Sequence, residues 1–247
     1  MDFSSGADRF PATRHSAVQA LRSDDAETRR RALDAIIEGY WRPVYKYLRL
    51  RWNKGPEAAE DLTQGFFLRV IEKEFLAGFD PAKARFRTFV RVCLDRYVTQ
   101  EDRDASRLKR GGGSDPLSLD YDDVEGQIAS DHVATIGDPQ AFFDREWVRD
   151  LLSTAVDDLR LLCESGNKMI AFQLFQKYDL EQLDRDEHVT YVSLAEEHGI
   201  STETVTNHLA WARRVFRAAV LERIRSMTAS DDEFRLEVRT VLGVDAP

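Results

Sequence analysis

The sequence contains few of the residues that build catalytic and metal sites. Its 247 residues include two cysteines and five histidines. Cys93 and Cys163 lie far apart within apolar helical patterns, which indicates buried, reduced thiols and argues against a disulfide or a metal site. The histidines are scattered along the chain without the spacing of metal ligands or of acid–base pairs. These absences argue against an enzyme and predict that the chain uses no metal or other cofactor.

Long hydrophobic runs and strand patterns are also missing. No run of about 18 apolar residues occurs, so the sequence predicts no membrane-spanning helix. The first ten residues, MDFSSGADRF, do not combine a basic start with an apolar segment, and we expect no signal peptide and a cytoplasmic location. No segment alternates apolar and polar residues as a strand does, whereas helical spacing recurs along the chain. The sequence therefore predicts an all-α protein.

The formal net charge of −9 argues at first against a nucleic-acid-binding protein, because such proteins normally carry a basic surface. The acidic residues are concentrated in the middle of the chain, since residues 111–160 contain twelve acidic and three basic residues, a net of −9. Residues 81–110 contain nine basic and four acidic residues, and residues 205–225 contain five basic residues and one acidic residue. Two basic zones therefore flank an acidic middle, and each is a candidate contact for a polyanion.

Glycine, proline and charge mark the expected domain boundaries. Residues 111–137 begin with Gly-Gly-Gly-Ser, continue through an acidic stretch and show little helical periodicity, so we interpret them as a flexible linker. Asp138 and Pro139 then suit the cap and the first position of a helix. The predicted parts are a helical domain at 1–110, the acidic Gly-rich linker at 111–137, a second helical domain at 138–227 and a C-terminal tail at 228–247 with a short helix over 231–242.

Residues 191–217 predict two short helices joined by a tight turn. The first helix has an apolar face formed by Val192, Leu194 and Ala195. Gly199 stands where the turn needs a positive φ, and Ser201 suits the N-cap of the second helix. The second helix repeats apolar residues at helical spacing, namely Val205, Leu209, Ala212 and Phe216. Its outer face is left polar and basic, which favours a DNA-binding helix-turn-helix; an ordinary surface hairpin is the alternative.

The first domain combines basic and aromatic residues in a loop and a helix. Helices are expected over residues 57–76 and 86–107, and Gly65 inside the first of them costs about 1 kcal/mol relative to alanine, which indicates a close approach of backbone or of a partner. The second helix and the loop before it carry Arg85, Arg87, Arg91, Arg96, Arg103 and Arg107, interleaved with Phe86, Phe89 and Tyr97. Cations can hold phosphates while rings take unstacked bases, so this zone suits single-stranded nucleic acid. The same rings also suit a hydrophobic core.

These motifs resemble those of bacterial RNA polymerase sigma factors of the extracytoplasmic-function (ECF) class. The resemblance is carried by YWRPVYKYLR, AEDLTQGFFLRV, FDPAKARFRTFVR and KRGGG in the first half and by SLAEEHGISTETVTNHLAWARR in the second. It covers nearly the whole chain and is closest to the subgroup with an extended linker and a C-terminal tail. It implies a promoter-recognition subunit that binds core RNA polymerase and promoter DNA, with a region 2-like domain at 1–110 and a region 4-like domain at 138–227. No membrane contact is implied.

The resemblance also implies roles for three groups of residues. Docking on polymerase is implied for Asp61, Gln64 and Phe67. Recognition and melting of the minus-ten element are implied for Asp80, Lys83, Arg85, Arg87, Thr88 and Arg91. DNA contacts at the minus-thirty-five element are expected for Thr202, Thr206, Asn207, Trp211, Arg213, Arg214 and Arg217. Related factors often carry an asparagine where Arg96 stands and basic residues where Thr206, His208 and Trp211 stand, so the resemblance does not identify the target promoters.

Two other functions fit parts of the pattern. A stand-alone helix-turn-helix transcriptional regulator would act without core polymerase, as a dimer on a pseudo-palindromic site. A structural adaptor would keep the fold without promoter activity. The combination of the arginine-rich loop and helix with the DLTQGFF segment favours the sigma factor over both. An anti-sigma factor or another regulator is a further candidate partner, and the sequence leaves the activating signal open.

Overall fold

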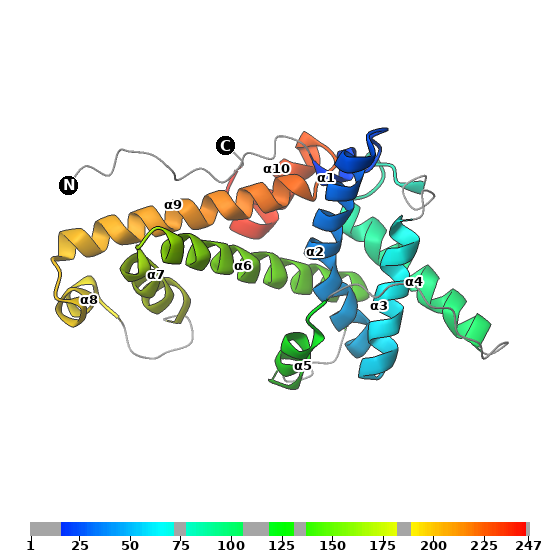
Figure 1. Ribbon diagram of the computed structural model, residues 1–247, viewed down its shortest axis with the longest axis horizontal. Coiled ribbons are helices and arrows are strands. Elements are labelled where there is room, and N and C mark those ends of the chain that lie inside the picture. Colours follow the sequence, from blue (N-terminus) through cyan, green and yellow to red (C-terminus); the bar gives the residue numbers. More distant parts are fainter. Residues whose placement is uncertain (1–15, 72–77, 106–118, 131–136, 182–188, 246–247) are drawn as a thin grey trace. The chain divides into compact units, whose positions relative to one another are not determined.

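The computed structural model describes residues 16–71, 78–105, 119–130, 137–181 and 189–245 (Figure 1). Every regular element in these residues is a helix, so the all-α prediction is confirmed for the part of the chain that is described. Among the same residues, none of the helices is both long and apolar enough to cross a membrane. The chain forms two compact units, which we call the larger unit (residues 14–150 and 224–247) and the smaller unit (residues 151–223).

These units differ from the predicted domains at two places. Residues 138–150, expected to open the second domain, belong to the larger unit, and so do the C-terminal residues 224–247, expected as a separate tail. Helices α6 (Pro139–Ser165) and α9 (Thr202–Ser226) each supply residues to both units. The change of composition near residue 138 therefore marks the start of a helix and not a border between units.

The larger unit has an aromatic core. Its remaining helices are α1 (Ala17–Ala20), α2 (Ala26–Leu50), α3 (Pro56–Ile71), α4 (Phe86–Ala105), α5 (Tyr121–Ser130) and α10 (Asp231–Leu242). Tyr40 of α2 packs edge-on against Phe86 of α4, with ring centroids 5.7 Å apart, and against Trp147 of α6 at 6.3 Å. All three side chains are buried. The core is thus built by rings from helices that are distant in sequence.

Several predicted helix boundaries are confirmed. Helix α10 covers the predicted residues 231–242. Helix α6 starts at Pro139, and the Asp138 carboxylate accepts hydrogen bonds from the backbone N–H groups of Gln140 and Ala141 at 3.2 and 3.1 Å. Helix α2 is one continuous helix that runs through Pro43.

The predicted linker is helical over part of its length. Residues 121–130 form α5, in which Tyr121, Val124 and Ile128 are buried at helical spacing. Its Glu125 carboxylate pairs with the Arg49 guanidinium of α2 at 2.5 Å. The prediction of a flexible tether is therefore wrong for residues 121–130, because their acidic composition hid a three-residue apolar stripe. The rest of the predicted linker lies largely outside the described residues, which do not include 111–118 or 131–136.

The C-terminal segment packs as part of the larger unit. The Met227 side chain lies against Gly39 of α2, where an added Cβ would come within 1.8 Å of Met227 Cε. The Ser16 hydroxyl donates to the backbone carbonyl of Thr228. Helix α10 is capped by Ser230 at its start and ends at Gly243 with a φ of 66°. The segment expected as a separate tail is thus an integral part of a folded unit.

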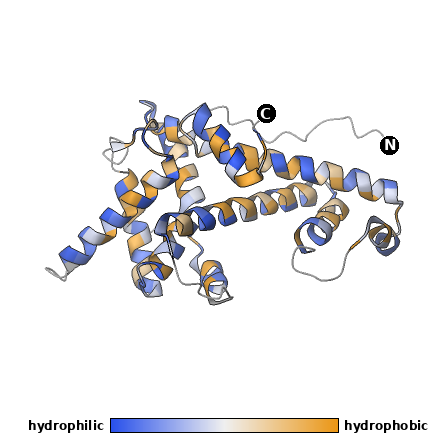
Figure 2. Ribbon diagram, turned by 180° about the vertical axis from the view of Figure 1, so that it is seen from behind, coloured by the Kyte–Doolittle hydropathy of each residue, from blue (hydrophilic) through white to orange (hydrophobic). Residues whose placement is uncertain are grey.

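The smaller unit contains the second part of α6, α7 (Met169–Phe175), the π-helical turn η2 (Gln176–Leu180), α8 (Tyr191–His198) and most of α9. Leu159, Phe175, Leu194 and Leu209 come from four of these helices and pack in one core cluster. The helices carry both hydrophobic and hydrophilic residues along their length (Figure 2), as expected for helices that bury one face.

Candidate nucleic-acid interface

Helices α8 and α9 are joined by the turn that the sequence predicts. Thr190 and Ser193 form a capping box at the start of α8. Gly199 ends α8 in the left-handed conformation, with φ 63° and ψ 33°, a conformation that favours glycine. Ser201 then caps α9, because its hydroxyl accepts a hydrogen bond from the Thr204 N–H at 3.1 Å. Val192, predicted to lie on the apolar face of α8, is instead 57% exposed.

Helix α9 presents a polar and basic face to solvent. The apolar residues Val205, Leu209, Ala212 and Val215 are buried in the core of the smaller unit. Five of the seven residues expected to contact DNA are exposed: Thr202, Thr206, Asn207, Arg214 and Arg217. The Thr206 hydroxyl donates to the Thr202 carbonyl at 2.9 Å, which leaves its oxygen lone pairs and its methyl group for other contacts. A helix with this face has the side chains that read base edges and phosphates.

Arg213 has a partner inside the protein. Its Nε lies 3.1 and 3.0 Å from the two carboxylate oxygens of Asp179, and its Nη2 lies 2.9 Å from Oδ1. The guanidinium also lies over the Tyr178 ring, 5.4 Å from the centroid. The Asp179 hydrogen bonds raise the pKa of Arg213. Unlike its exposed neighbour Arg214, Arg213 therefore ties α9 to η2.

Trp211 is half-buried and forms one wall of a small pocket. The pocket has a volume of about 270 Å³ and is lined by Lys168, Asn207, His208, Ala210, Trp211 and Arg214. Burial and then the positive charge of Lys168 lower the pKa of His208. Lys168 was not singled out from the sequence, because it precedes α7 and lies far from α9 along the chain. Only the fold brings it to the pocket.

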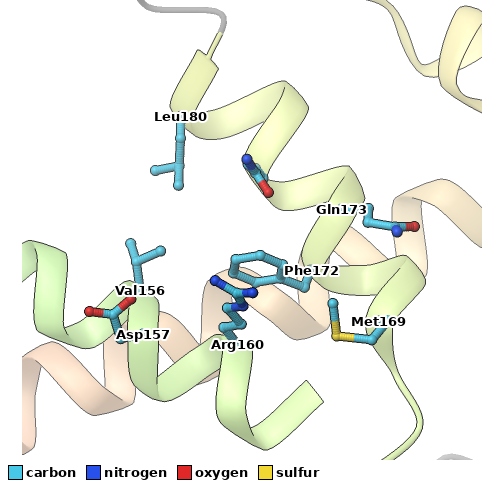
Figure 3. Close-up of a pocket in the computed structure, with 8 residues that line it drawn as sticks. Val156, Asp157, Arg160, Met169, Phe172, Gln173 and Leu180 are labelled. Carbon is cyan, nitrogen blue, oxygen red and sulfur yellow. The ribbon is translucent and has the colours of Figure 1, made fainter. Parts of the chain in front are cut away.

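A second cavity of the smaller unit is lined by both apolar and charged side chains (Figure 3). It has a volume of about 470 Å³ and lies between α6 and the segment formed by α7 and η2. Val156, Phe172 and Leu180 face it, and Asp157 and Arg160, which carry opposite charges, also line it. Because it has no excess of cationic groups, this cavity is less suited to nucleic acid than the pocket beside α9.

In the larger unit, the loop expected to contact the minus-ten element is partly exposed. Lys83 is exposed, and its ammonium pairs with the Asp80 carboxylate at 3.2 Å. The Asp80 carboxylate also accepts a hydrogen bond from the Ala82 N–H at 3.0 Å. This backbone bond, followed by the contact with Lys83, lowers the pKa of Asp80. Asp80 thus shapes the loop and leaves Lys83 as its exposed cation.

Arg87 and Arg85 are paired with carboxylates of the larger unit. Arg87 is only 2% exposed; its Nε lies 3.1 Å from Asp144 and its Nη1 lies 3.0 Å from Glu237 of α10. Its guanidinium also lies 4.9 Å from the centroid of the Trp147 ring. Half-buried Arg85 lies 3.8 Å from Asp144 and 3.6 Å from Glu237. The expected DNA role of Arg87 therefore conflicts with its burial, because an arginine enclosed by carboxylates cannot reach a phosphate without a rearrangement.

The other two residues of the expected minus-ten group are half-buried. Arg91 donates to Asp95 at 2.5 Å and to the Gln140 side chain at 2.6 Å, and Thr88 lies on the same helix. The six expected residues therefore do not form one exposed surface.

A pocket between α3 and α4 is lined by basic and aromatic residues, a combination that the six residues expected to contact the minus-ten element do not form. It has a volume of about 340 Å³ and is lined by Phe66, Arg69, Cys93, Arg96, Tyr97 and Gln100. Arg69 and Arg96 are exposed, and the Arg69 guanidinium lies 5.3 Å from the centroid of the Tyr97 ring. Burial raises the pKa of Cys93 to about 11, so its thiol stays protonated at neutral pH. The sequence contained both arginines, but only the packing of two helices shows that they share a pocket.

The three expected docking residues of α3 differ in exposure. Asp61 is exposed and Gln64 is half-buried, whereas Phe67 is 1% exposed and packs against Phe66 with centroids 5.4 Å apart. Phe67 therefore belongs to the core and cannot contact a partner directly in this conformation. Asp61 remains available on the outer side of the helix, whereas Gln64 lies close enough to the buried Tyr121 hydroxyl of α5 to act on its pKa.

Comparisons with known protein families, with curated proteins and with solved structures found no match to this chain. The functional assignment therefore depends on the residues and geometry described above.

Proposed function

We propose that this chain is a sigma factor of the ECF class, which binds core RNA polymerase in the cytoplasm and directs promoter-specific initiation of transcription. In this proposal the chain is a DNA-reading subunit, and the chemistry of RNA synthesis belongs to the polymerase. The observation that carries the proposal is the exposed polar and basic face of α9, held on α8 by the left-handed turn at Gly199. The docking motif and the arginine-rich motif in the first half of the chain support the further proposal that the chain binds polymerase and the opened DNA strand.

Reading of the minus-thirty-five element is assigned to α9, the second helix of the proposed helix-turn-helix. An α-helix fits the major groove, where an asparagine can pair with both N6 and N7 of adenine. Asn207 and Thr206 are exposed for contacts with base edges, and Arg214 and Arg217 are exposed for phosphates. Arg213 supports the helix through Asp179 and is not among the proposed direct contacts.

Capture of the opened minus-ten strand is assigned to the pocket between α3 and α4 and to Lys83 in the loop that precedes α4. Exposed Arg69 and Arg96 supply charge for the backbone, and the Tyr97 and Phe66 rings supply apolar surface for a base. Extruding a base from the duplex costs a few kcal/mol, and binding it in a pocket offsets that cost. Arg85 and Arg87 instead hold α4 against α6 and α10.

Docking on polymerase is assigned to the outer side of α3. Asp61 is exposed there, and Phe67 supports the helix from the core side. Asp61→Ala should weaken co-elution with core polymerase. Glu57→Ala is the matched control, since Glu57 is an exposed acidic residue one turn earlier in the same helix.

The deciding experiment is transcription in vitro with purified core polymerase and promoter fragments from the source genome. A sigma factor should co-elute with core and initiate at specific sites. A stand-alone regulator should instead bind duplex DNA as a dimer without core. A chain that binds neither core nor DNA would exclude both functions and leave the structural adaptor.

A further inference from the structure

The pocket beside α9 has the size and charge of a site for one small anionic group. None of its six lining residues is acidic, and it contains both the Lys168 ammonium and the Arg214 guanidinium. Its volume of about 270 Å³ is below the range of about 300–1,000 Å³ that is common for drug-sized ligands. A phosphate group, which is compact and accepts several hydrogen bonds, matches both properties.

Lys168 is held in position by the Trp211 ring. Its Nζ lies 4.3 Å from the ring centroid, within the range of a cation–π contact. A long lysine side chain normally loses rotamer freedom when it binds a ligand. Because the ring already restrains Lys168, part of that entropy has been lost before an anion arrives.

His208 adds a neutral hydrogen-bond donor to the same pocket. Burial and the charge of Lys168 lower its pKa, so the imidazole is uncharged at neutral pH. A neutral imidazole keeps one N–H donor and does not repel the two cations. The Asn207 amide supplies further donors at the rim.

The pocket adjoins the exposed face of α9. Asn207 and Arg214 belong to both. An α-helix with its side chains is about 10–12 Å wide, and the major groove is about 12 Å wide. Side chains on the flank of a helix in that groove therefore face the sugar–phosphate backbone at its edge.

We propose that this pocket binds one backbone phosphate of the DNA strand at the edge of the groove, between Lys168 and Arg214. This inference rests on the DNA-binding role proposed for α9. It adds Lys168, a residue outside the helix pair, to the contacts that set the register of the helix on DNA.

Binding of the full-length protein to a short labelled duplex of mixed sequence tests the inference by fluorescence anisotropy over roughly 50–200 mM salt. Lys168→Gln should weaken binding about three- to tenfold at the lowest salt. It should also reduce the slope of log affinity against log salt by up to about 0.9, the value for one phosphate. Lys168→Arg keeps the charge and should retain both the affinity and the salt slope of the wild type. A Lys168→Gln protein that binds like the wild type would overturn the inference while leaving the proposed function intact.

Lys177→Gln is the matched control. Lys177 lies in the same unit, and its ammonium already pairs with the Glu197 carboxylate at 2.5 Å. This variant should keep the affinity and slope of the wild type. An equal loss in the control would indicate a general effect of net charge and would overturn a local site. A wild-type protein without salt-dependent DNA binding would overturn this inference, whereas the proposed function fails only if the chain neither co-elutes with core polymerase nor initiates at specific sites.

The double variant Lys168→Gln/Arg214→Gln tests whether the two cations share one phosphate. If they do, the total loss of slope should stay near 0.9. A loss of about 1.8 would place them on separate phosphates and overturn the shared site.

Inorganic phosphate, titrated at constant ionic strength, separates a free anion from the DNA backbone. Phosphate that stabilises the wild type but not Lys168→Gln against heat, combined with unchanged DNA affinity of the variant, would assign the pocket to a free anion. That result would overturn the DNA contact.

Discussion

Arg213 and Arg214 are neighbours in α9, yet they differ in what surrounds them. The Arg213 guanidinium is bound by both carboxylate oxygens of Asp179, whereas Arg214 is exposed beside the pocket of Trp211. A side chain with an internal partner contributes to stability, and an exposed cation on a DNA-facing helix contributes to binding. Adjacent residues of one type can therefore have separate functions.

Alanine variants at these two positions should separate the effects. Arg213→Ala should lower the free energy of unfolding by about 1 kcal/mol or less, because the pair is partly exposed and therefore screened by solvent. Arg214→Ala should leave unfolding unchanged but weaken duplex binding and reduce its salt dependence. Urea unfolding and fluorescence anisotropy measure the two properties. Equal salt slopes for Arg214→Ala and the wild type would contradict the assignment of Arg214.

Gly65 allows α3 to pass close to α4. A Cβ added at Gly65 would lie 2.2 Å from the Tyr97 hydroxyl oxygen but 3.4 Å from Cζ, the ring carbon bonded to that oxygen. Tyr97 is buried, so its ring cannot simply move into solvent. The glycine inside the helix is thus explained by the close approach of the Tyr97 side chain, whereas the sequence had indicated backbone or a partner.

Gly65→Ala should destabilise the protein by about 1 kcal/mol, because a clash of about 1–3 kcal/mol outweighs the gain of about 1 kcal/mol in helix propensity. In a Tyr97→Phe background, which lacks the hydroxyl, the same change should be neutral or stabilising. Gly126→Ala is the control, since a Cβ at this α5 position meets no atom within 4 Å. Urea unfolding of the wild type, Gly65→Ala, Tyr97→Phe and the double variant gives the coupling energy between the two positions. Additive changes in the free energy of unfolding would contradict the proposed clash.

At the scale of elements, α10 acts as a structural part of the larger unit. Its Glu233 carboxylate accepts the Phe86 N–H at the start of α4, at 2.6 Å, and its Glu237 pairs with Arg87. Carboxylates near the first N–H groups of a helix satisfy donors that have no partner within the helix. Helix α10 therefore stabilises the start of α4.

Glu237→Ala should lower the free energy of unfolding by about 2–4 kcal/mol, because it removes one partner of a buried arginine and leaves only Asp144. Asp232→Ala is the matched control on the same helix. Its ion pair with Arg235 is exposed and should contribute less than about 1 kcal/mol. Urea denaturation measures both, and a Glu237→Ala protein as stable as the control would show that α10 is not held by this pair.

The Glu237 carboxylate predicts a pH dependence of the free energy of unfolding. Burial raises the pKa of Glu237 above its ordinary value of 4.5, despite the opposing charges of Arg87 and Arg85. The folded protein therefore binds this proton more tightly than the unfolded chain, and the resulting stabilisation is present below pH 4.5 and lost as pH rises through the folded-state pKa. The free energy of unfolding of the wild type minus that of Glu237→Gln should fall as pH rises from about 4.5. A difference that rises with pH would show that ion pairing outweighs burial.

At the scale of the whole molecule, the two units carry separate candidate contacts with nucleic acid. The smaller unit carries the exposed face of α9, and the larger unit carries the pocket between α3 and α4. The net charge of −9 does not prevent either contact, since exposed arginines lie at both places, Arg69 and Arg96 at the pocket and Arg214 and Arg217 on α9. We therefore expect recognition and opening of a promoter to be separable.

The double variant Arg69→Ala/Arg96→Ala should impair strand opening more than duplex binding, because these cations are proposed to hold an opened strand. Arg214→Ala should impair initial binding instead. Permanganate reactivity of unpaired thymines measures opening by the complex with core polymerase, and gel shift measures binding. Arg30→Ala is the control, since Arg30 is exposed and pairs with Glu27 at 2.9 Å. Normal opening by the double variant would remove the single-strand role of the pocket.

Local sequence signals predicted the helices of this protein well. The caps at Asp138 and Ser201, the left-handed turn at Gly199 and the limits of α10 were all indicated by neighbouring residues. This success has a physical reason, because helix starts, stops and buried faces depend on residues within a few positions of one another. Helix α5 is the exception, since its short apolar stripe lies in an acidic, glycine-rich context.

The sequence by itself thus determined that the chain is helical and that α9 has one apolar and one basic face. Only the tertiary structure decided which charged residues remain available to a partner. Arg87 and Arg213 are paired with carboxylates from distant segments, whereas Arg96 and Arg214 are exposed. Spacing within one helix cannot reveal a partner such as Glu237, because the fold alone brings segments that are far apart in sequence into contact.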